Sequence, residues 1–436
     1  MQHNEVVQKL QSNFSTTKNL KESGIPWLGK IPKHWEMRRV KHLFEIGRGR
    51  VISQEELDDS GMYPVYSSQT QDNGVLGYIR TYDFDCEQIT WTTDGVNAGT
   101  VFLRRGKHNC TNVCGTLRPK NKNENIVFLT FALQNATPYY KRPDTNGAKI
   151  MNNEMAEILL IYPPLKEQQA IADFLDKKTR QIEKFIDKKQ KLITLLEEKK
   201  QTLINQCVTQ GLDPSTSLKD SGVEWLGKIP THWEIKKLKY ISKVVLGKML
   251  CNEKQEGYSH CYYLKSKNLQ WLNVDISQVE KMWFSEYEKS IYRVKKDDLL
   301  VSEGGEVGKT CIWNDEIEEC YIQNSVHKIT IDSLNHPRFF LYVFFVYGKK
   351  GVFESIVNRV SIAHLVLEKL INIDFAVPPF QEQKAIAEYL DTQIAKIDLA
   401  ISKIKSQINL IKEYKSTLIS EAVCGRVKIN LEKAVK

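Results

Sequence analysis

Three sets of residues are of types that could catalyse a reaction or hold a cofactor. The first, Ser302–Thr310 (SEGGEVGKT), ends in Gly-Lys-Thr, as a phosphate-binding loop of the form GxxxxGK[ST] does. That loop needs a glycine five positions before its last glycine, but Glu303 stands there and its carboxylate would repel phosphate. The sequence therefore argues against an ATP site.

The second candidate is the pair of double prolines. The stretch "VPPF" from Val377 is similar to the Asp/Asn-Pro-Pro-Tyr/Phe loop of amino-methyltransferases. Val377, however, replaces the polar residue that would accept a hydrogen bond from the target amine. The other copy, "YPPL", has Tyr162 at that position, and no glycine-rich loop follows an apolar strand to hold S-adenosylmethionine. Both double prolines are interpreted as the end of an extended segment, directly before a helix begins.

The third candidate is a set of histidines and cysteines. His108, Cys110 and Cys114 lie close together, as do His260 and Cys261, but neither group has a second ligand pair at zinc-site spacing. His34 and His232 recur between a proline and a tryptophan without a neighbouring acid or nucleophile, which indicates a structural role. We predict no catalytic or metal site in this chain.

Composition favours a globular protein with at least two domains. The chain has 436 residues, of which 41% are apolar, and its 62 Lys and Arg against 53 Asp and Glu give a net charge of +9. This excess permits a polyanionic partner without requiring one. The first twenty residues lack a secretion signal, the most apolar run ("FFLYVFFVYG" from Phe339) is about half the ~20 residues of a membrane span, and nine scattered cysteines suit reduced thiols. We expect a soluble protein of the cytoplasm with no membrane partner.

Two motifs occur twice in the same order, so the chain is a tandem repeat. Ser23–Leu43 and Ser221–Ile241 share 12 of 21 positions at an offset of 198 residues, and the 14-residue stretches from Pro163 and Pro378 share 9 positions at an offset of 215. The segments between these motifs, 44–162 and 242–377, share little except turn-rich punctuation. Their short β-branched and aromatic runs indicate strands with some helix.

A long amphipathic helix is predicted after each double proline, the first from about Lys166 to Gln210. Apolar residues recur at alternating steps of four and three, which is a heptad seam that needs a partner helix, and the other copy is the nearest one. Gly211 and Gly425 are predicted stops. Lys189, Lys200 and Lys415 interrupt the seams. The residues expected to pair the helices or dock partners are Glu167, Gln168, Leu175, Ile182, Ile186, Ile193, Leu196, Leu203, Glu382, Gln383, Leu390, Ile394, Ile397, Ile401, Ile404, Ile408, Ile411 and Leu418.

Two sets of side chains are candidates for contact with nucleic acid. Basic clusters after each repeated motif suit phosphate contact, and loops rich in amides, hydroxyls and cations suit base reading. A solvated protein surface is the competing interpretation for both sets. The first half contributes Arg38, Arg39, Lys41, Arg48, Arg50, Gln69, Gln71, Asn73, Thr93, Asn97, Arg104 and Arg105. The second half contributes Lys236, Lys237, Lys239, Lys248, Lys265, Lys267, Asn268, Lys309, Arg359 and His364.

The order of these features resembles the specificity (S) subunit of type I restriction–modification systems. Each half opens with Trp-Leu-Gly-x-Ile-Pro-x-His-Trp, continues with a variable segment, and reaches Pro-Pro-x-x-Glu-Gln and a long helix. The resemblance covers essentially the whole length. It implies an α+β fold in which two similar globular α/β target recognition domains are separated by two long α-helices. These helices would pair as an antiparallel intramolecular coiled coil with pseudo-twofold symmetry.

The resemblance further implies a domain division and a set of partners. Residues 1–162 and 212–377 would be target recognition domains, each reading half of an asymmetric bipartite site on double-stranded DNA, and 163–211 and 378–436 constant helical regions. Gly95, Gly99, Gly304 and Gly308 match the glycine-rich loop of such domains. The helices would set the spacing and dock methyltransferase subunits, expected to number two, while the presence of a restriction (motor) subunit stays open. Such a subunit is not itself an enzyme, and S-adenosylmethionine and ATP would bind its partners in the prokaryotic cytoplasm.

Two other classes of function remain open from the sequence. The first is a self-contained DNA methyltransferase or nuclease, which would transfer a methyl group or cleave DNA without partners. The second is a coiled-coil scaffold whose globular ends bind proteins. Salt-dependent affinity for DNA separates the scaffold from a DNA-binding subunit.

Overall fold

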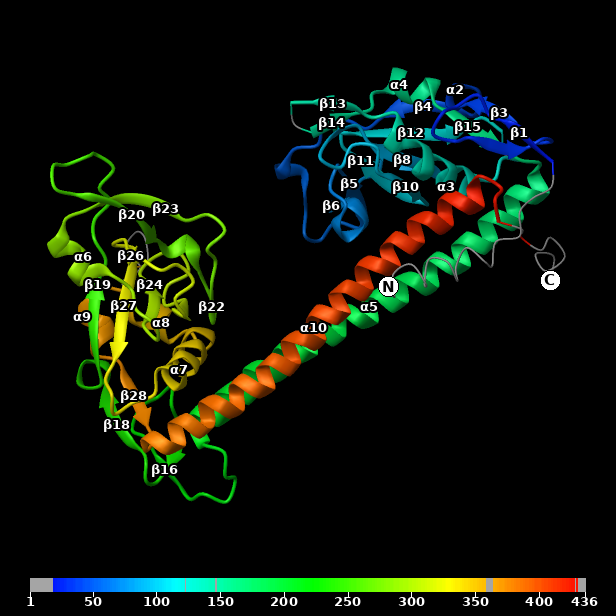
Figure 1. The fold of residues 1–436 in the computed structure, drawn as a ribbon. Coiled ribbons are helices and arrows are strands. Elements are labelled where there is room, and N and C mark those ends of the chain that lie inside the picture. Colours follow the sequence, from blue (N-terminus) through cyan, green and yellow to red (C-terminus); the bar gives the residue numbers. More distant parts are fainter. Residues whose placement is uncertain (1–18, 122, 146, 358–363, 428, 430–436) are drawn as a thin grey trace. The chain divides into compact units, whose positions relative to one another are not determined.

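The chain is built as two compact units with the same internal plan. The structure is a computed structural model that describes residues 19–121, 123–145, 147–357, 364–427 and 429. Unit 1 comprises residues 1–189 and 406–436, and unit 2 comprises residues 190–405, so each unit contains part of both long helices. Figure 1 labels most of the helices and strands of each unit.

Unit 1 contains two four-stranded sheets. The first is entirely antiparallel and has the order β10-β8-β12-β4; the second has the order β6-β5-β11-β7 and contains a parallel pair, β5 and β11. The strands of the first sheet are β4 (Phe44–Arg48), β8 (Gln88–Thr92), β10 (Val101–Arg104) and β12 (Cys114–Pro119). Those of the second are β5 (Tyr63–Tyr66), β6 (Val75–Ile79), β7 (Phe84–Asp85) and β11 (Lys107–Cys110).

Unit 2 repeats this topology. Its antiparallel sheet has the order β19-β27-β24-β25, and its second sheet has the order β23-β20-β26 with β20 and β26 parallel. The strands of the first sheet are β19 (Ser242–Leu246), β24 (Leu299–Ser302), β25 (Thr310–Ile312) and β27 (Val326–Ile331). Those of the second are β20 (Ser259–Leu264), β23 (Glu280–Phe284) and β26 (Cys320–Ile322). The two segments that share little sequence thus share one strand order.

Shorter elements complete each unit. Unit 1 adds β1 (Leu20–Glu22), β2 (Lys30–Pro32), α2 (Val40–Leu43), η1 (Gln54–Glu56), η2 (Gln71–Gly74), β9 (Asp94–Gly95), α3 (Ile126–Ala136), η3 (Thr137–Tyr139), β13 (Arg142–Asp144), β14 (Gly147–Lys149) and α4 (Asn152–Glu157). Unit 2 adds β16 (Leu218–Asp220), β17 (Lys228–Pro230), η4 (Leu238–Tyr240), η5 (Ser266–Asn268), β21 (Leu269–Gln270), β22 (Asn273–Val274), α6 (Glu286–Tyr292), α7 (Pro337–Lys349), α8 (Val352–Ile356) and α9 (Leu367–Ile371).

The most apolar run of the chain is a core helix. Helix α7 buries every residue from Phe339 to Tyr347, and Phe344 and Tyr347 pack their rings on Phe375. Across the described part of the chain, no helix is long and apolar enough to cross a membrane.

The two repeated motifs meet in each unit. In unit 1, β3 (Glu36–Arg39) pairs antiparallel with β15 (Leu159–Tyr162), the strand that leads into the double proline. In unit 2, β18 (Glu234–Lys237) pairs in the same way with β28 (Asp374–Val377). This pairing brings the His-Trp of the first motif to the Glu of the second, although about 130 residues (unit 1) and 150 residues (unit 2) separate them in sequence.

A carboxylate joins the motifs. The indole N–H of Trp35 donates to Glu167 Oε2 at 2.9 Å, and His34 Nε2 lies 2.7 Å from Glu167 Oε1. Unit 2 repeats the arrangement, with Trp233 donating to Glu382 at 3.1 Å and His232 Nε2 lying 2.8 Å from its other oxygen. The recurring histidines are therefore structural, as the sequence indicated, and their acid comes from the other motif.

The glutamines that follow these glutamates hydrogen-bond to the backbone just before each helix. Gln168 and Gln383 are buried, and their amides donate to the carbonyl oxygens of Pro163 and Pro378, each at 2.8 Å. Gln383 also donates to Asn335. Because these side chains are buried, they stabilise the frame of each unit. We use this name for the strand pair β3 and β15 with α2 in unit 1, for β18 and β28 with η4 in unit 2, and for the helix start that follows each pair.

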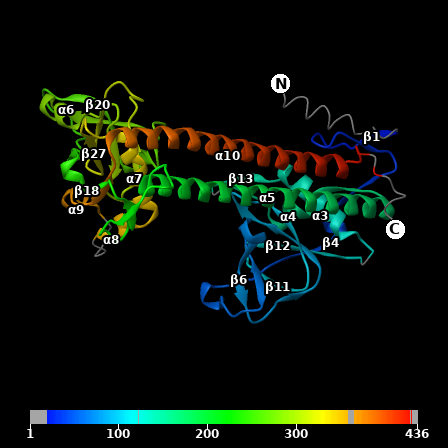
Figure 2. The same cartoon turned by 90° about the horizontal axis from the view of Figure 1, so that it is seen from below.

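The two long helices pair antiparallel within each unit, and both views draw them side by side (Figures 1 and 2). Helix α5 spans Leu165–Gln210 and helix α10 spans Phe380–Val423. In unit 1, Leu175 and Ile182 share a core with Leu418 and Ala422 of α10. In unit 2, Ile204 and Cys207 share a core with α10 residues near its start, Ile386, Leu390 and Ile394.

The predicted seam residues are the ones that the helices cover. In α5 the seam positions are buried or half-buried, and in α10 Ile394, Ile397, Ile401, Ile404 and Ile408 are each at most 9% exposed. The half-buried members are Ile186, Leu196, Leu203 and Ile411. The heptad pattern thus identified the packed face correctly.

Two of the seam lysines form matching ion pairs across the helices. Lys415 Nζ lies 2.7 Å from Glu183 in unit 1, and Lys200 Nζ lies 2.8 Å from Asp398 in unit 2. The offset of 215 residues that relates the double prolines also relates Lys200 to Lys415 and Glu183 to Asp398. Both contacts therefore fit one antiparallel register.

Each helix ends on a glycine that packs against the repeated motif. Gly211 has a φ of +77° and Gly425 a φ of +71°, the left-handed conformation that glycine adopts at helix ends. A Cβ at Gly211 would lie 3.0 Å from Glu382 Oε1, and one at Gly425 would lie 2.7 Å from the Trp35 ring. In each unit the start of one helix and the end of the other therefore meet at the same Trp.

The Glu382 carboxylate can be tested by substitution. We expect E382A to lower the free energy of unfolding by about 1–3 kcal/mol, because the indole N–H of Trp233, which is fully buried as a residue, loses its acceptor. The E382Q variant keeps an acceptor and should lose less. Urea unfolding followed by tryptophan fluorescence measures both.

The matched control is E197A, which removes an exposed carboxylate from the surface of α5. Its effect should stay within about 0.5 kcal/mol of the parent. Equal loss in E382A and E197A would contradict a role for Glu382 as the acceptor of Trp233.

Candidate nucleic-acid interface

Four loops of unit 1 meet at one edge of its sheets. They follow β4, β5, β8 and β11 and comprise residues 49–53, 67–74, 93–100 and 111–113, which we call the loop edge of unit 1. Backbone hydrogen bonds tie them together: Arg50 N donates to Cys110 O at 3.1 Å, Thr111 N to Tyr66 O at 2.9 Å, and Thr93 N to Val113 O at 3.0 Å.

Unit 2 forms the same edge with the same links. Lys248 N donates to Ile322 O at 3.1 Å, Gln323 N to Leu264 O at 3.0 Å, and Glu303 N to Ser325 O at 2.9 Å. The loop edge of unit 2 comprises residues 247–251, 265–268, 303–309 and 323–325. The backbone scaffold is therefore common to the units, while the side chains on it differ.

The unit 1 edge presents several predicted polar side chains to solvent. Gln71, Asn73 and Asn97 are exposed, and their side chains have no hydrogen-bond partner among the described residues. Asp72 and Asn73 adopt positive φ values of 48° and 54° in the turn that carries them. Gln69 instead donates to Val75 O, and Thr93 is buried with its hydroxyl donating to Val113 O.

Arg104 lies inside unit 1 and does not reach the surface. It is 1% exposed, its guanidinium stacks 3.5 Å from the Tyr66 ring centroid, and it donates to Asn73 O at 2.7 Å. Burial lowers the pKa of Arg104. This placement corrects the prediction of a direct nucleic-acid contact, because the side chain is enclosed and holds the turn at Asn73 from within.

The first residues of each predicted basic cluster lie on the frame, at the opposite end of β4 and β19 from the loop edges. In unit 1, Arg38 pairs with Glu36, and Arg39 and Lys41 both pair with Glu157. In unit 2, Lys236 pairs with Glu234, Lys237 with Asp374, and Lys239 donates to Asn372. Arg105 also lies away from the loop edge and pairs with Glu87 at the start of β8. Phosphate contact by these residues stays a prediction.

Ion pairs also anchor the cation that follows β4 and β19. Arg50 contacts Glu56 at 2.8 Å and Asp83 at 3.1 Å, and hydrogen bonding to Glu56 is the main effect that raises its pKa. Lys248 is 9% exposed, contacts Glu288 at 2.5 Å and donates to Trp283 O. Arg50 is exposed and anchors its loop at the surface, while Lys248 is buried and anchors its loop from within.

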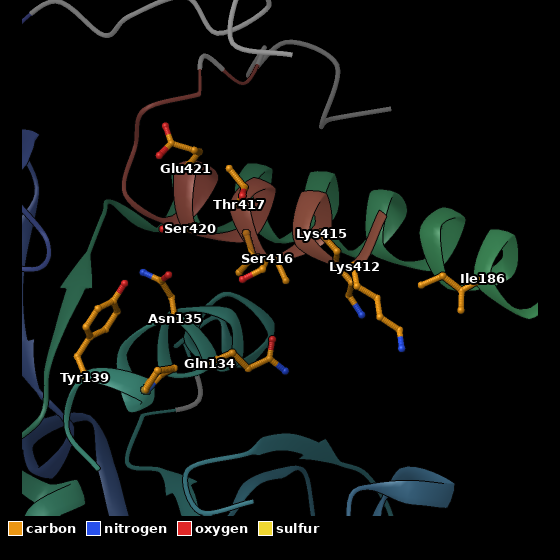
Figure 3. A pocket seen from close by; sticks show the side chains of 12 residues that line it. Gln134, Asn135, Tyr139, Ile186, Lys412, Lys415, Ser416, Thr417, Ser420 and Glu421 are labelled. Atoms are coloured by element: carbon orange, nitrogen blue, oxygen red, sulfur yellow. The ribbon is translucent and has the colours of Figure 1, made fainter. Parts of the chain in front are cut away.

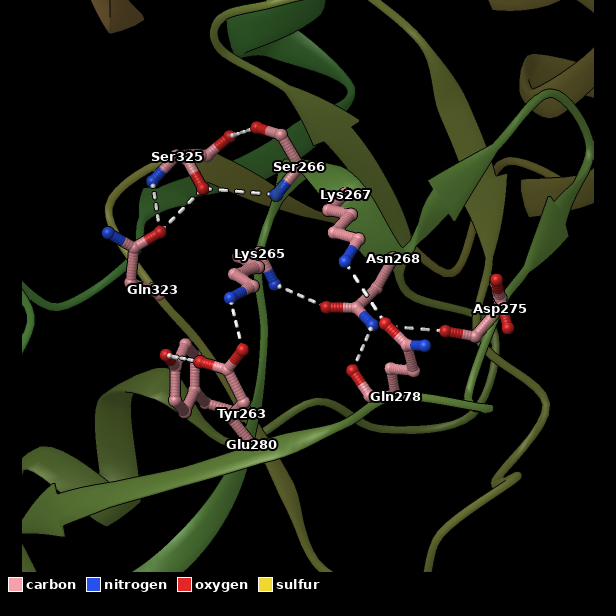
Figure 4. Close-up of polar contacts among 10 residues, drawn as sticks. All are labelled: Tyr263, Lys265, Ser266, Lys267, Asn268, Asp275, Gln278, Glu280, Gln323 and Ser325. Atoms are coloured by element: carbon pink, nitrogen blue, oxygen red, sulfur yellow. Dashed lines mark hydrogen bonds and ion pairs between the residues drawn. The ribbon is translucent and has the colours of Figure 1, made fainter. Parts of the chain in front are cut away.

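Figure 4 shows the polar cluster of the unit 2 edge. Lys265 pairs with Glu280 at 2.5 Å, and Asn268 is buried and donates to the carbonyl oxygens of Asp275 and Gln278. Lys267 is exposed and its Nζ lies 3.0 Å from Gln278 Oε1. Lys267 and Gln278 therefore present a cation and an amide together at the surface.

The remaining predicted residues of unit 2 surround the glycine loop. Lys309 pairs with Glu306 at 2.8 Å, and Glu306 accepts from the indole of Trp271. Burial raises the pKa of Glu303, and the exposed His364 opposes that rise. Arg359 lies outside the described residues.

Two predicted cations at or directly beside the loop edges are exposed and form no ion pair within 4.0 Å among the described residues. Arg48 donates to the carbonyl oxygen of Asn112. Lys267 donates to Gln278 Oε1 and also interacts electrostatically with Asp275 and Glu280. Arg48, unlike the ion-paired cations of the frame, therefore has charge available for an anionic ligand.

The histidine and cysteine group of unit 1 is a buried structural cluster. His108 Nε2 lies 2.8 Å from the Gln88 amide, and burial raises the pKa of the Cys114 thiol to about 11. Within the described ranges, no three His, Cys, Asp or Glu side chains gather as a metal site.

Both halves of the chain match one family model, described as "Type I restriction modification DNA specificity domain", over residues 32–194 and 230–410. The chain belongs to this DNA specificity family. The two matched ranges, called specificity domains from here on, include the loop edges, the frames and most of both long helices.

Curated relatives match part of this specificity protein. A Mycoplasma pneumoniae protein named as type I specificity subunit S.MpnORF507P is 46% identical over 138 residues, which is 31% of this chain and 38% of the relative. The MpnII type I restriction enzyme specificity subunit of the same organism is 44% identical over 142 residues, covering 32% of this chain and 43% of the relative. The chain thus spans about two fifths of the length of these two relatives.

A solved structure shares the fold of the specificity domains. The chain aligns with one from a study of complex assembly and conformational transition of the type I R-M system, with a TM-score of 0.67 and 12% identity. The alignment covers 91% of this chain and 99% of that one.

Unit 1 also carries a groove beside its helices that polar and apolar side chains line together. Gln134 and Asn135 of α3 face the last turns of α10, where Lys412 and Lys415 line a volume of about 610 Å³ (Figure 3). A second groove of about 410 Å³ shares Gln134 and Lys415 and extends along residues 96–101 of the loop edge. The two grooves connect the glycine loop of the first specificity domain with the end of α10.

Sequence reasoning missed the turn that links the two sheets of each specificity domain. Asn112 in unit 1 and Asn324 in unit 2 occupy equivalent positions, because Arg50 bridges Thr111 as Lys248 bridges Gln323. The side chain of Asn112 is exposed and that of Asn324 half-buried. The turns have different sequences, so only the shared strand order reveals their equivalence.

Proposed function

We propose that this chain is the sequence-specific DNA-binding subunit of a type I restriction–modification complex and carries no catalysis of its own. The observation that carries the proposal is the loop edge, which occurs twice with the same backbone links and different side chains. Family membership over both halves supports it. Two similar scaffolds with unlike surfaces suit two unlike half-sites on one duplex.

Each specificity domain reads one half of an asymmetric bipartite site in this proposal. The domain division is 1–162 and 212–377 for target recognition, with 163–211 and 378–436 as the constant helices. Amides pair with adenine in the major groove and cations with guanine or phosphate. Gln71, Asn73 and Asn97 are the first domain's candidates, and Lys267 and Gln278 the second's.

The partners and cofactors follow from the same proposal. The chain binds double-stranded DNA and methyltransferase subunits, and a restriction subunit joins where the system cleaves DNA. S-adenosylmethionine and ATP bind those partners, in the prokaryotic cytoplasm where the DNA lies.

Exchange of one variable segment tests whether each domain reads one half-site independently of the other. Replacing residues 44–162 by the same segment of a relative should change one half-site and leave the other unchanged, because each loop edge belongs to one unit. Co-expression with the methyltransferase subunits and mapping of methylated adenines in the host genome measures both half-sites.

The parent chain and the methyltransferase alone are the controls. Changes in both half-sites would contradict modular reading. Methyl transfer to DNA by the purified chain without partners would overturn the non-catalytic role and favour a self-contained methyltransferase.

The helix pair sets the distance between half-sites in this proposal. Inserting one heptad into each helix, between Glu183 and Lys200 in α5 and between Asp398 and Lys415 in α10, keeps the seam and both ion pairs. The insertion adds about 10 Å, so the gap between half-sites should widen by about three base pairs. Methylation mapping reports the new gap.

An insertion in α5 alone serves as the comparison, because it moves one ion pair out of register. That variant should lose specific methylation rather than gain a wider gap. An unchanged gap in the variant with both insertions would contradict the proposal that the helix pair sets the distance between half-sites.

Exposed apolar residues outside the seam are candidates for docking the methyltransferase. Leu195 on α5 is 59% exposed and Leu410 on α10 is 46% exposed, and the offset of 215 residues relates them. Leu165 and Phe380, 51% and 38% exposed, form a second related pair. Two equivalent surfaces suit two copies of one partner.

Stoichiometry tests this docking surface. L195D and L410D should each lower the number of methyltransferase subunits per chain from two to one, and the double variant should bind none. Native mass spectrometry of the co-purified complex counts them, with L334D as the control at an exposed loop position of unit 2. Two bound subunits in the double variant would rule out this surface.

A further inference from the structure

A matched four-residue block stands at each loop edge. Directly after β4 comes Gly49-Arg50-Val51-Ile52, and directly after β19 comes Gly247-Lys248-Met249-Leu250. The offset of 198 residues that relates the repeated motifs relates these blocks too. Each consists of a glycine, a cation and two apolar residues.

The apolar residues of the blocks are strongly exposed. Val51 is 71% exposed, Met249 75% and Leu250 51%, while Ile52 is half-buried. Exposure of a single apolar side chain is ordinary in a soluble protein. Exposure at related positions of two segments with little sequence in common indicates a shared use.

The fold holds these side chains in place rather than leaving them on a loose loop. A Cβ at Gly49 would overlap the carbonyl oxygens of Cys110 and Thr111, and one at Gly247 would overlap that of Gln323, so both positions require glycine. The following cation is fixed by acids, Arg50 by Glu56 and Asp83, and Lys248 by Glu288. The next residue therefore projects from an anchored backbone.

The blocks adjoin the turn that joins the two sheets. Lys248 O accepts from Asn324 N at 2.8 Å, and Arg48, just before the first block, donates to Asn112 O. An exposed apolar residue thus lies beside an asparagine turn in both units, within the loop edge that the proposed function assigns to DNA.

We infer that Val51 and Met249 make an apolar contact with the bases of their half-sites, at equivalent points of the two domains. This inference rests on the proposed function. Apolar side chains gain nothing from phosphates, but they pack on thymine methyl groups or against unstacked base steps. The asparagine turn and the uncompensated Arg48 beside Val51 favour DNA over an apolar protein surface as the occupant.

The test replaces the exposed side chain and follows DNA binding by the assembled complex. M249S should weaken binding to the methylated site, identified by genome mapping, by about five- to twentyfold, and V51S by a smaller factor, because less apolar surface is lost. The slope of log affinity against log salt should not change, since no phosphate contact is removed. Fluorescence anisotropy with a labelled duplex measures both quantities.

The location of the effect adds a second readout. In M249S, base-pair changes in the half-site read by residues 212–377 should weaken binding less than they do in the parent. Base-pair changes in the other half-site should weaken binding as much as in the parent. V51S should show the reverse. L334S, which changes a 79% exposed leucine at the far end of β27, is the matched control and should bind as the parent does.

Three results would overturn the inference. These are parental affinity in both V51S and M249S, a loss accompanied by a shallower salt dependence, and release of the methyltransferase subunits with each variant. The last result would assign the blocks to a protein interface. Failure of the proposed function is distinguishable, because the parent complex itself would then show no preference for any site.

Discussion

The carboxylate at the start of each long helix is the contact on which the rest of the architecture depends. Glu167 and Glu382 each accept the indole N–H of a buried tryptophan that belongs to the other repeated motif. The same tryptophans receive the glycine end of the opposite helix, so strand frame, helix start and helix end meet at one residue in each unit. Loss of either tryptophan or carboxylate would therefore disturb the strand pair and both helix ends of its unit together.

Register between the helices needs polar contacts as well as the apolar seam. An unbroken run of isoleucine could slide by a heptad at little cost, because each position would meet an equivalent one. Lys200 and Lys415 lie in the seam and reach Asp398 and Glu183, which are more exposed. Surface ion pairs of this kind contribute about 0.5 kcal/mol each, so their value lies in excluding other registers rather than in stability.

The sequence predicted what depends on local pattern and repetition. The repeats, both long helices, their glycine ends and the packed seam follow from spacing along the chain, and the structure confirms them. The strand order within the variable segments could not be predicted, because β5 pairs with β11 and β4 with β12 across loops whose sequences differ between the halves. Arg104 shows the limit for single residues: its neighbours suggested a surface loop, but a cation between the rings of Tyr66 and Phe102 is recognisable only once two sheets are packed.

Compensation of charge shapes what the specificity domains can do. Most cations near the repeated motifs already contact acids, as Arg39 and Lys41 do with Glu157, so the net charge of +9 overstates the attraction of the frame for an anion. The exposed cations that lack such partners at the loop edges are few, and amides and apolar groups surround them. The loop edges therefore present amides, cations and apolar side chains together, and these side chains differ between the two units. The two units thus keep one strand order and the same backbone links between loops while the charge and polarity of their loop edges differ.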